Sequence, residues 1–225
     1  LAFAAKPGLF VKIGVGVLRQ PDSKPYDHYR HYQIVDGGRR ETHATANSVT
    51  FTQTLSGAGY AYRYEKTITL VPGTGRMVIN HVLTNTGTAP IDTTVYDHNF
   101  LRLVPGNNGI RIGFPFTVHP DMAQAANAPA PDLMAIKGGS LVYLRPQKNK
   151  ERVSFTLTGF GDSAADYDIA VTAPGGAGVH IRGDAPVTKI NIFSVDRVQA
   201  VEPYIAIHVP PGDRQHWRYT YDFTP

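Results

Sequence analysis

The residues with the clearest chemical potential in this chain are Tyr96, Asp97, His98, Asn99 and Phe100, which follow one another directly. They place an imidazole, a carboxylate and a carboxamide between two aromatic rings, at the end of a run of β-type residues. Side chains alternate between the faces of a strand, so Tyr96, His98 and Phe100 are expected on one face, opposite Asp97 and Asn99. A histidine in this setting either packs half-buried against the core or lines an aromatic-walled site.

Glu202, in the segment from 200 to 209, is the second candidate for acid/base chemistry. The odd positions of the segment supply an apolar face: Val201, Ile205, Ile207 and Val209. The even positions supply a small and polar face: Ala200, Glu202, Tyr204, Ala206 and His208. This second face either meets water or binds a ligand. Pro203 has no N–H for a ladder, which predicts an edge or bulged position beside Glu202.

Two other polar clusters contain residue types that can bind metals. His28 and His31 lie three residues apart, so they face opposite sides of a strand, and no third ligand stands at a recognised spacing. Asp162, Asp166 and Asp168 lie on one turn, but without the spacing or the terminal Glu of an EF-hand loop. Asx turns on a solvated face are therefore favoured over a calcium site.

The elements that position these groups read as strands. Residues 10–18 form a nearly continuous β-branched run, in which Gly14 and Gly16 permit a bulge or a close approach, and Lys12 is either an edge charge or a pocket lysine. Further strands are expected at 49–55, 60–70, 77–84, 91–100, 140–144, 153–157, 169–171, 179–181, 189–195, 201–209 and 217–223. Short connections in the first half favour a meander, and no helix longer than a turn or two is expected. Residues 105–135 lack periodicity and are expected to form an irregular rim over a site.

The totals predict one soluble all-β domain over residues 1–225. The net charge of +4 comes from scattered Lys and Arg without a basic stripe, which argues against a nucleic-acid partner. No apolar run is long enough to span a membrane. The absence of cysteine excludes thiol catalysis and disulfides. Residues 1–5 are too short for a signal peptide, and the missing initial Met leads us to expect a preceding segment.

Several motifs, taken in order from residue 10 to 223, resemble the aldose 1-epimerase (galactose mutarotase-like) superfamily. They are the Asn-Thr-Gly turn at 85–87, the Tyr-Asp-His-Asn-Phe stretch at 96–100, and Glu202 ahead of a Pro-Gly turn at 211–212 and an aromatic closing strand. The chain is most similar to a bacterial branch with comparable segments at 12–16, 96–100, 160–162 and 202–204. The resemblance implies an all-β fold, a β-supersandwich of two large antiparallel sheets, with N-terminal strands absent from this numbering.

The resemblance also implies a chemistry. In the superfamily a His protonates the sugar ring oxygen while a Glu accepts the proton of the anomeric hydroxyl, so His98 is expected as general acid and Glu202 as general base. No metal or organic cofactor is expected. The residues expected to bind the sugar are Lys12, Arg30, Tyr96, Asn99, Asp168 and Tyr204. A second active-site histidine has three candidates: His28, His31 and His81.

The first functional hypothesis is therefore a mutarotase acting on a hexose or another sugar with a free reducing end. A non-catalytic carbohydrate-binding module is the first alternative, and a polysaccharide-degrading, lyase-type relative that uses a tyrosine is the second. The enzyme hypothesis requires that His98 and Glu202 face each other across about the width of a sugar ring. Relatives in this branch often look exported, which points to a periplasmic or secreted bacterial protein, and the oligomeric state is not predicted.

Overall fold

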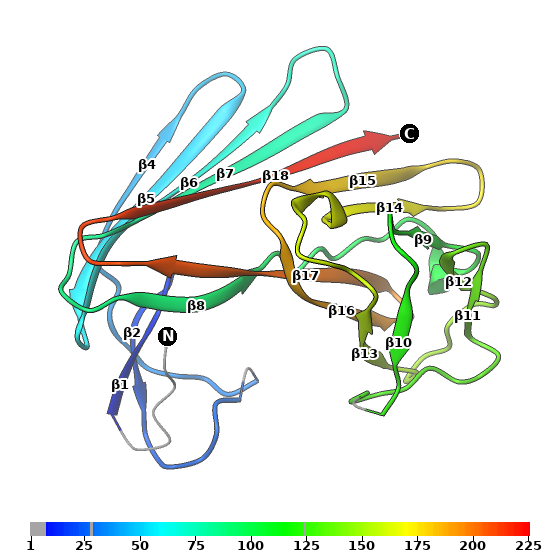
Figure 1. Cartoon of the computed structure of the whole chain (residues 1–225), viewed down its shortest axis with the longest axis horizontal. Coiled ribbons are helices and arrows are strands. Elements are labelled where there is room, and N and C mark those ends of the chain that lie inside the picture. The colour runs from blue at the N-terminus through cyan, green and yellow to red at the C-terminus, as the bar shows by residue number, and fades with distance from the viewer. Residues whose placement is uncertain (1–7, 28, 124) are drawn as a thin grey trace. The chain divides into compact units, whose positions relative to one another are not determined.

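The computed structural model describes residues 8–27, 29–123 and 125–225 and shows a chain built almost entirely from β-strands (Figure 1). The helical structure in these residues consists of two single-turn 3-10 helices, η1 (Pro105–Asn107) and η2 (Ala164–Asp166). In the same residues no helix is long and apolar enough to cross a membrane. The prediction of an all-β chain is confirmed.

The strands in chain order are β1 (Gly8–Lys12), β2 (Gly16–Gln20), β3 (Ile34–Asp36), β4 (Arg39–Ala44), β5 (Ser48–Gly57), β6 (Tyr60–Leu70), β7 (Arg76–Asn85), β8 (Ile91–Tyr96), β9 (Arg111–Gly113), β10 (His119–Asp121), β11 (Met134–Lys137), β12 (Ser140–Tyr143), β13 (Val153–Thr158), β14 (Asp168–Thr172), β15 (Gly178–Gly183), β16 (Val187–Val195), β17 (Val198–Val209) and β18 (Arg214–Thr224).

These strands form two large sheets and one small one. The ten-stranded sheet has the order β11-β12-β9-β14-β15-β18-β7-β6-β5-β4, and the five-stranded sheet has the order β10-β13-β16-β17-β8. The third sheet is β1-β2-β3. Neighbouring strands pair antiparallel. The fold is thus the predicted β-supersandwich of two large antiparallel sheets.

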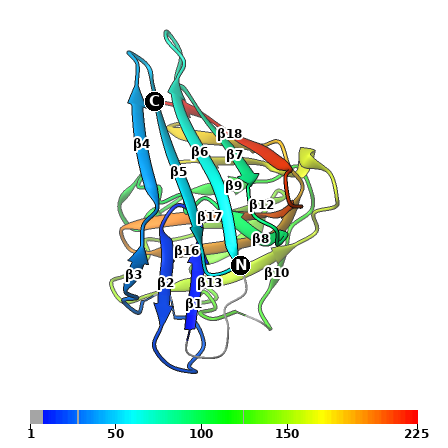
Figure 2. The same cartoon turned by 90° about the vertical axis from the view of Figure 1, so that its left-hand side faces the viewer.

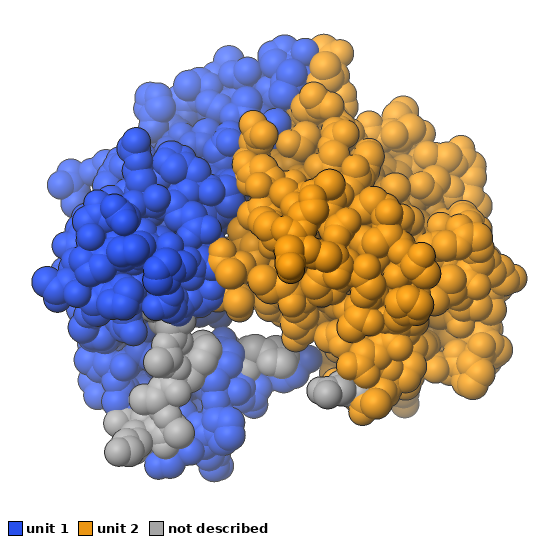
Figure 3. Space-filling view, viewed as in Figure 1, with its two compact units in different colours: residues 1–72, 78–93, 207–217 blue, residues 73–77, 94–206, 218–225 orange. Residues whose placement is uncertain are grey.

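The chain folds into two compact units, coloured separately in Figure 3. Unit 1 comprises residues 1–72, 78–93 and 207–217, and unit 2 comprises residues 73–77, 94–206 and 218–225. Each unit is assembled from separate segments, so the chain passes between them several times. The expectation of one domain over residues 1–225 stays a prediction.

Unit 1 contains the meander of β4, β5, β6 and most of β7, which are consecutive neighbours in the sheet (Figure 2). The hairpin between β5 and β6 turns on Ala58 and Gly59, which both have positive φ, as a two-residue type I′ turn requires. Leu55, Tyr62 and Leu83 are buried on one face of the meander. The alternation in residues 49–84 therefore predicted this part of the fold correctly.

Unit 2 contains β13 and β16 with most of β17, side by side in the five-stranded sheet. Their core face consists of fully buried apolar residues: Val153, Phe155, Leu157, Ile190, Ile192, Val201 and Ile205. A slip of one residue would turn this whole set toward solvent, at about 1.5–3 kcal/mol for each large side chain. The register is therefore fixed, and the residues between these positions must face the other side of the sheet.

Residues 10–18 do not form the single strand that was predicted. They form the hairpin of β1 and β2, in which Val11 pairs with Val17 and the turn lies at 13–15. Gly14 has φ of 80°, a left-handed conformation that suits glycine. A Cβ on Gly16 would lie 2.2 Å from the backbone oxygen of Asp36, so the expected close approach is present. The two glycines turn the chain where continuous β-branched residues would have kept it straight.

Residues 105–135 are more regular than predicted, because they contribute β9 and β10. Ile110 and Ile112 are completely buried around the start of β9, which lies between β12 and β14. β10 is an outer strand of the five-stranded sheet, next to β13. Such short strands carry too few residues for a visible alternation, and pairing with neighbours stabilises them. The role of this region as a rim stays a prediction.

Candidate active site

His98 and Glu202 are in direct contact within unit 2. The imidazole Nδ1 of His98 lies 3.0 Å from Oε1 of Glu202. The second carboxylate oxygen, Oε2, accepts a hydrogen bond of 2.9 Å from Nδ2 of Asn191. The side chain of Glu202 is 5% exposed and that of His98 39% exposed. The pair therefore joins a buried carboxylate to a half-exposed imidazole.

The sheet register fixes the carboxylate. Asn191 of β16 pairs with Glu202 of β17, so their side chains emerge side by side on the face opposite the core. A buried carboxylate is costly unless polar partners compensate it: Asn191 donates to Oε2, and Nδ1 of His98 lies within ion-pair distance of Oε1. Glu202 is thus held from both sides.

The distance between His98 and Glu202 is shorter than expected. His98 and Glu202 lie on one face of one sheet, with Nδ1 and Oε1 3.0 Å apart, and not at the width of a sugar ring. The physical reason is the burial of Glu202, which requires donors within about 3 Å. Nε2, the other ring nitrogen of His98, takes no part in this contact.

The backbone that carries His98 is irregular. β8 ends at Tyr96, and the chain rejoins β17 only at the bridge between Leu101 and Gln199. Within this interruption the backbone N–H of Phe100 donates to the carbonyl of His98. Pro203 lies on the stretch of β17 that faces the interruption, where its missing N–H leaves no ladder bond unmade. The strand order places β17 inside the sheet, which excludes the edge position. The bulged alternative agrees with a register shift between Val187 and Lys189, opposite Ile205 and Tyr204.

Alternation nevertheless persists through the irregular segment. On one side, the His98 ring contacts the rings of Tyr96 and Phe100, at centroid distances of 5.8 and 3.9 Å. On the other side, the hydroxyl of Tyr221 lies 2.7 Å from Oδ1 of Asn99 and 3.1 Å from Oδ2 of Asp97. The two faces predicted from the sequence are confirmed.

Aromatic rings surround the imidazole and extend along β17. The Phe193 ring meets His98 edge-on, with centroids 5.9 Å apart. Tyr96 and Tyr204 stack at 4.3 Å, and the ammonium of Lys189 lies 4.9 Å from the centre of the Tyr204 ring. Burial, followed by the proximity of Tyr96 and Glu202, raises the pKa of Tyr204 well above its usual range. Tyr204 is therefore a neutral phenol at physiological pH.

Together these residues form one surface, here named the site face. It consists of Tyr96, His98, Phe100, Lys189, Asn191, Phe193, Glu202 and Tyr204. The site face combines a proton donor and acceptor with flat apolar rings, which suits a polyhydroxylated ring that has apolar C–H patches.

The fold itself is found in solved structures. A candidate aldose 1-epimerase from Escherichia coli K12 aligns with a TM-score of 0.62 and 14% identity over 96% of this chain and 78% of its own. A galactose mutarotase-like protein from Lactobacillus casei aligns with a TM-score of 0.59 and 12% identity, over 97% and 82% of the two chains. The chain has the galactose mutarotase-like fold. The Synechocystis protein Slr1438 aligns with a TM-score of 0.59 and 10% identity. The alignment covers 82% of this chain and 65% of the length of Slr1438.

Comparison of sequences adds no further assignment. No protein-family model matches the chain. No curated protein matches it. At identities of 10–14% the structural likeness establishes the galactose mutarotase-like fold, and any activity has to be argued from the site face.

Lys12 and Arg30, expected to bind the sugar, belong to unit 1. Lys12 ends β1, an outer strand of the small sheet, and its ammonium donates to the hydroxyl of Tyr26 over 3.2 Å. The guanidinium of Arg30 makes two hydrogen bonds to Asp22, at 2.8 and 2.9 Å, and lowers the pKa of that carboxyl to about 2. Both cations have local partners, and their sugar-binding role stays a prediction.

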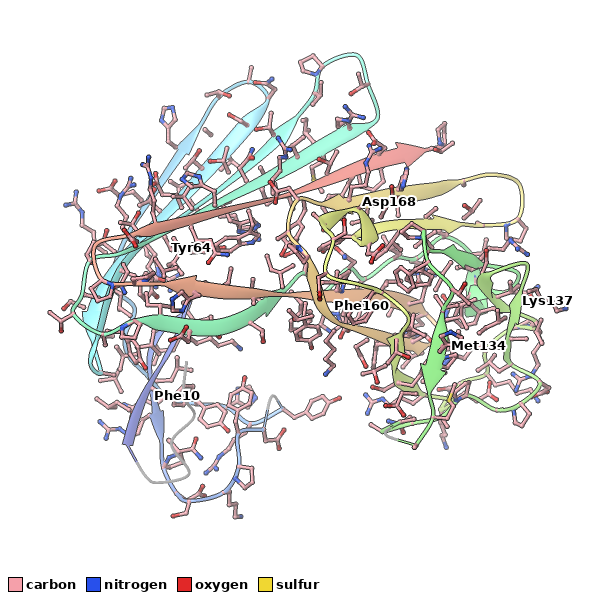
Figure 4. The ribbon with its side chains drawn as sticks, in the orientation of Figure 1. Phe10, Tyr64, Met134, Lys137, Phe160 and Asp168 are labelled. Carbon is pink, nitrogen blue, oxygen red and sulfur yellow. The ribbon has the colours of Figure 1, made fainter. Side chains whose placement is uncertain are left out.

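Asp168 begins β14 on the ten-stranded sheet and is labelled in Figure 4. Its carboxylate pairs with the imidazole of His180 on β15. Asp166 accepts a hydrogen bond of 2.6 Å from the backbone N–H of Gly161, and the hydroxyl of Ser163 caps η2. The turn thus contains the side-chain to backbone hydrogen bonds that the sequence favoured. Among the described residues, no three His, Cys, Asp or Glu side chains gather as metal ligands.

The three candidates for a second active-site histidine differ in their surroundings. His28 lies outside the described residues, as does the segment 1–5. His31 is exposed in a loop of unit 1. His81 is buried in unit 1, with Nδ1 2.7 Å from the hydroxyl of Tyr64 and its ring stacked on Trp217 at 4.8 Å. Burial lowers the pKa of His81 to about 3, so it is a neutral core histidine.

Sequence reasoning did not single out Asn191, Lys189 or Phe193. Their signal was present: Val195 and Val198 pair across a two-residue connection, which sets the register of β16 against β17. Counting back from that turn places Asn191 opposite Glu202 and Lys189 opposite Tyr204. Asn99 is also placed differently from a sugar ligand, because its amide donates to the carbonyl of Val201 over 3.2 Å and accepts from Tyr221.

Proposed function

We propose that this chain is an aldose 1-epimerase-like enzyme, which interconverts the anomers of a sugar with a free reducing end. The observation that carries the proposal is the contact between His98 and Glu202 on an aromatic face, in a galactose mutarotase-like fold. An imidazole and a carboxylate in one place provide the acid and the base that ring opening needs.

The proposed reaction moves two protons. Glu202 accepts the proton of the anomeric hydroxyl while protonated His98 donates one to the ring oxygen, and the bond between C1 and the ring oxygen breaks. The carbonyl carbon then rotates about its bond to C2. Ring closure on the opposite face returns both protons, so the two side chains finish as they began. Concerted transfer avoids a free oxyanion, and each positioned group contributes about 10²–10⁴ in rate.

The geometry assigns different mobility to the two groups. Both sugar oxygens are attached to C1, so the sugar has to enter between Oε1 of Glu202 and the imidazole, in place of their 3.0 Å contact. Glu202 is buried in a regular strand and held by Asn191. His98 is 39% exposed on the irregular segment. We therefore expect His98 to move aside and Glu202 to stay.

The aromatic rings complete the proposed site. Tyr96, Phe100 and Tyr204 offer flat surfaces on which the C–H patches of a sugar can stack. Stacking would orient the ring with its anomeric carbon beside the pair, which is the positioning that makes proton transfer efficient.

The test is the decay of freshly dissolved α-anomers toward equilibrium, followed by NMR or polarimetry with a panel of sugars. The wild type should accelerate the decay, and His98→Ala and Glu202→Gln should each lower the rate by about 10²–10⁴. His208→Ala is the matched control, because His208 also pairs with a carboxylate, that of Asp92, but lies in unit 1. If His98→Ala retains the full rate, the proposed acid is excluded.

One observation favours a carbohydrate-binding module as the second candidate. Both oxygens of Glu202 have a partner in the protein, Asn191 at Oε2 and His98 at Oε1, as they would if the carboxylate only shaped the surface. Saturable binding of sugars without any acceleration of anomer exchange would support that candidate. The raised pKa of Tyr204 opposes a tyrosinate at that position, so Tyr204 is not the base that the lyase alternative requires.

A further inference from the structure

The site face carries a cation for which the proposed proton transfer has no use. Lys189 lies on β16, opposite Tyr204 and two residues before Asn191, on the same face of the strand. Its ammonium is 4.9 Å from the centre of the Tyr204 ring. Within the described parts of the chain, no carboxylate lies within ion-pair distance of Lys189. The charge is held beside the acid/base pair and is not neutralised there.

Neither Glu202 nor Asp121, which the register places on this face, serves Lys189. Glu202 is engaged by His98 and Asn191. Asp121 lies on β10, two strands from β16, which corresponds to about 10 Å at the usual strand spacing. At the opposite end of the face, the guanidinium of Arg152 lies 5.9 Å from the centre of the Phe193 ring. The acid/base pair is therefore flanked by cations along β16.

We propose that the sugar bound on this face carries an anionic substituent, a carboxylate or a phosphate, and that Lys189 binds it. This inference rests on the proposed function for the position of the sugar ring. Lys189 is about 7 Å along the strand from Asn191, and an extended lysine reaches about that far. In the orientation that this inference assumes, C1 and the ring oxygen lie at the pair, and the substituent on the carbon next to the ring oxygen points toward Tyr204 and Lys189.

The position of Lys189 also determines what the side chain can do. Its ammonium lies over the Tyr204 ring, 4.9 Å from the ring centre, and this cation–π contact leaves the N–H donors of the ammonium for a ligand. A neutral sugar gains from this ammonium only hydrogen bonds to its hydroxyls, which replace hydrogen bonds to water. An anion gains a charge-assisted hydrogen bond, so Lys189 would discriminate between charged and neutral hexoses.

The test compares glucose and galactose with glucuronate, galacturonate and glucose 6-phosphate, measuring both binding by calorimetry and anomer exchange by NMR. Anionic sugars should bind about tenfold more tightly than neutral ones, and added salt should weaken only the anionic ones. Uronates and the phosphate are separate arms, so the data also identify the preferred anion.

The variants are Lys189→Gln, which keeps the stem and removes the charge, and Lys189→Arg, which keeps the charge. Lys189→Gln should abolish the preference for anionic over neutral sugars, and Lys189→Arg should restore most of that preference. Lys137→Gln is the control, because Lys137 ends β11 on the ten-stranded sheet and is labelled in Figure 4.

The outcomes separate this inference from the proposed function. Exchange of neutral and anionic sugars at equal efficiency, unchanged in Lys189→Gln, overturns the inference and leaves the mutarotase proposal standing. Tight, Lys189-dependent binding of an anionic sugar without anomer exchange supports the inference and overturns the mutarotase proposal.

Discussion

Asn191 offers the sharpest test of how the sheet holds the proposed base. It donates a hydrogen bond of 2.9 Å to a carboxylate whose side chain is 5% exposed. Hydrogen bonds to charged groups contribute about 1.5–3 kcal/mol, and a buried acceptor that loses its donor carries the desolvation cost. We expect Asn191→Ala to lower the free energy of unfolding by about 2 kcal/mol at neutral pH.

The measurement is denaturant unfolding of matched variants. Thr156 pairs with Asn191 on the next strand and shares its face, so Thr156→Ala is the control and should change the free energy of unfolding by less than about 0.5 kcal/mol. A double-mutant cycle with Glu202→Gln should give a coupling energy of about 1 kcal/mol. Equal losses for Asn191→Ala and Thr156→Ala, together with additive effects in the cycle, would refute the idea that Asn191 holds the carboxylate.

Two further predictions concern groups away from the proton transfer. Burial, with a smaller effect of Lys66, lowers the pKa of His81 to about 3, below the ordinary 6.5 of the unfolded chain. The unfolded state therefore binds the proton first, and stability should fall between pH 6.5 and 3, by at most about 1.4 kcal/mol per pH unit, with a flatter pH profile of unfolding for His81→Gln. Tyr221→Phe removes the hydroxyl that contacts Asn99 and Asp97, and it should lower the free energy of unfolding by about 1–2 kcal/mol. It should also broaden the NMR signals of residues 97–100, and unchanged signals would contradict this prediction.

The sequence predicted the elements that are half-buried and long. Residues 60–70 alternate over many positions, and β6 follows them from Tyr60 to Leu70. The same holds for the apolar positions of β17, where Val201, Ile205 and Ile207 are buried. Alternation is readable when one face of a strand packs and the other meets solvent. Short strands such as β9 and β10 lack this signal, because three residues cannot show a period.

The site was predictable only in part, for a different physical reason. The sequence showed an imidazole at position 98 and a carboxylate at position 202. Their contact depends on a β-bridge between Leu101 and Gln199, two residues that lie far apart in the sequence. The environment of Glu202 depends on register, which side-chain alternation alone does not specify. The two-residue connection after Val195 would have supplied that register, and with it Asn191, Lys189 and Phe193.

The contrast between β17 and the end of β8 suggests why the site lies where it does. A carboxylate that has to stay in place is best carried by a regular strand, and Glu202 lies on β17, paired with Asn191 of β16 and hydrogen-bonded to it. The imidazole of His98 has to move when the sugar ring binds, so its position cannot be fixed in the same manner. His98 follows the point where β8 ends, and Tyr221 contacts the side chains of Asp97 and Asn99 on either side of it. These contacts hold the backbone of the segment from the face opposite His98. The imidazole of His98 can therefore change its rotamer while the backbone keeps its position. A continuous strand through residues 97–100 would align the same side chains, but it would remove the freedom that the proposed exchange of partners requires.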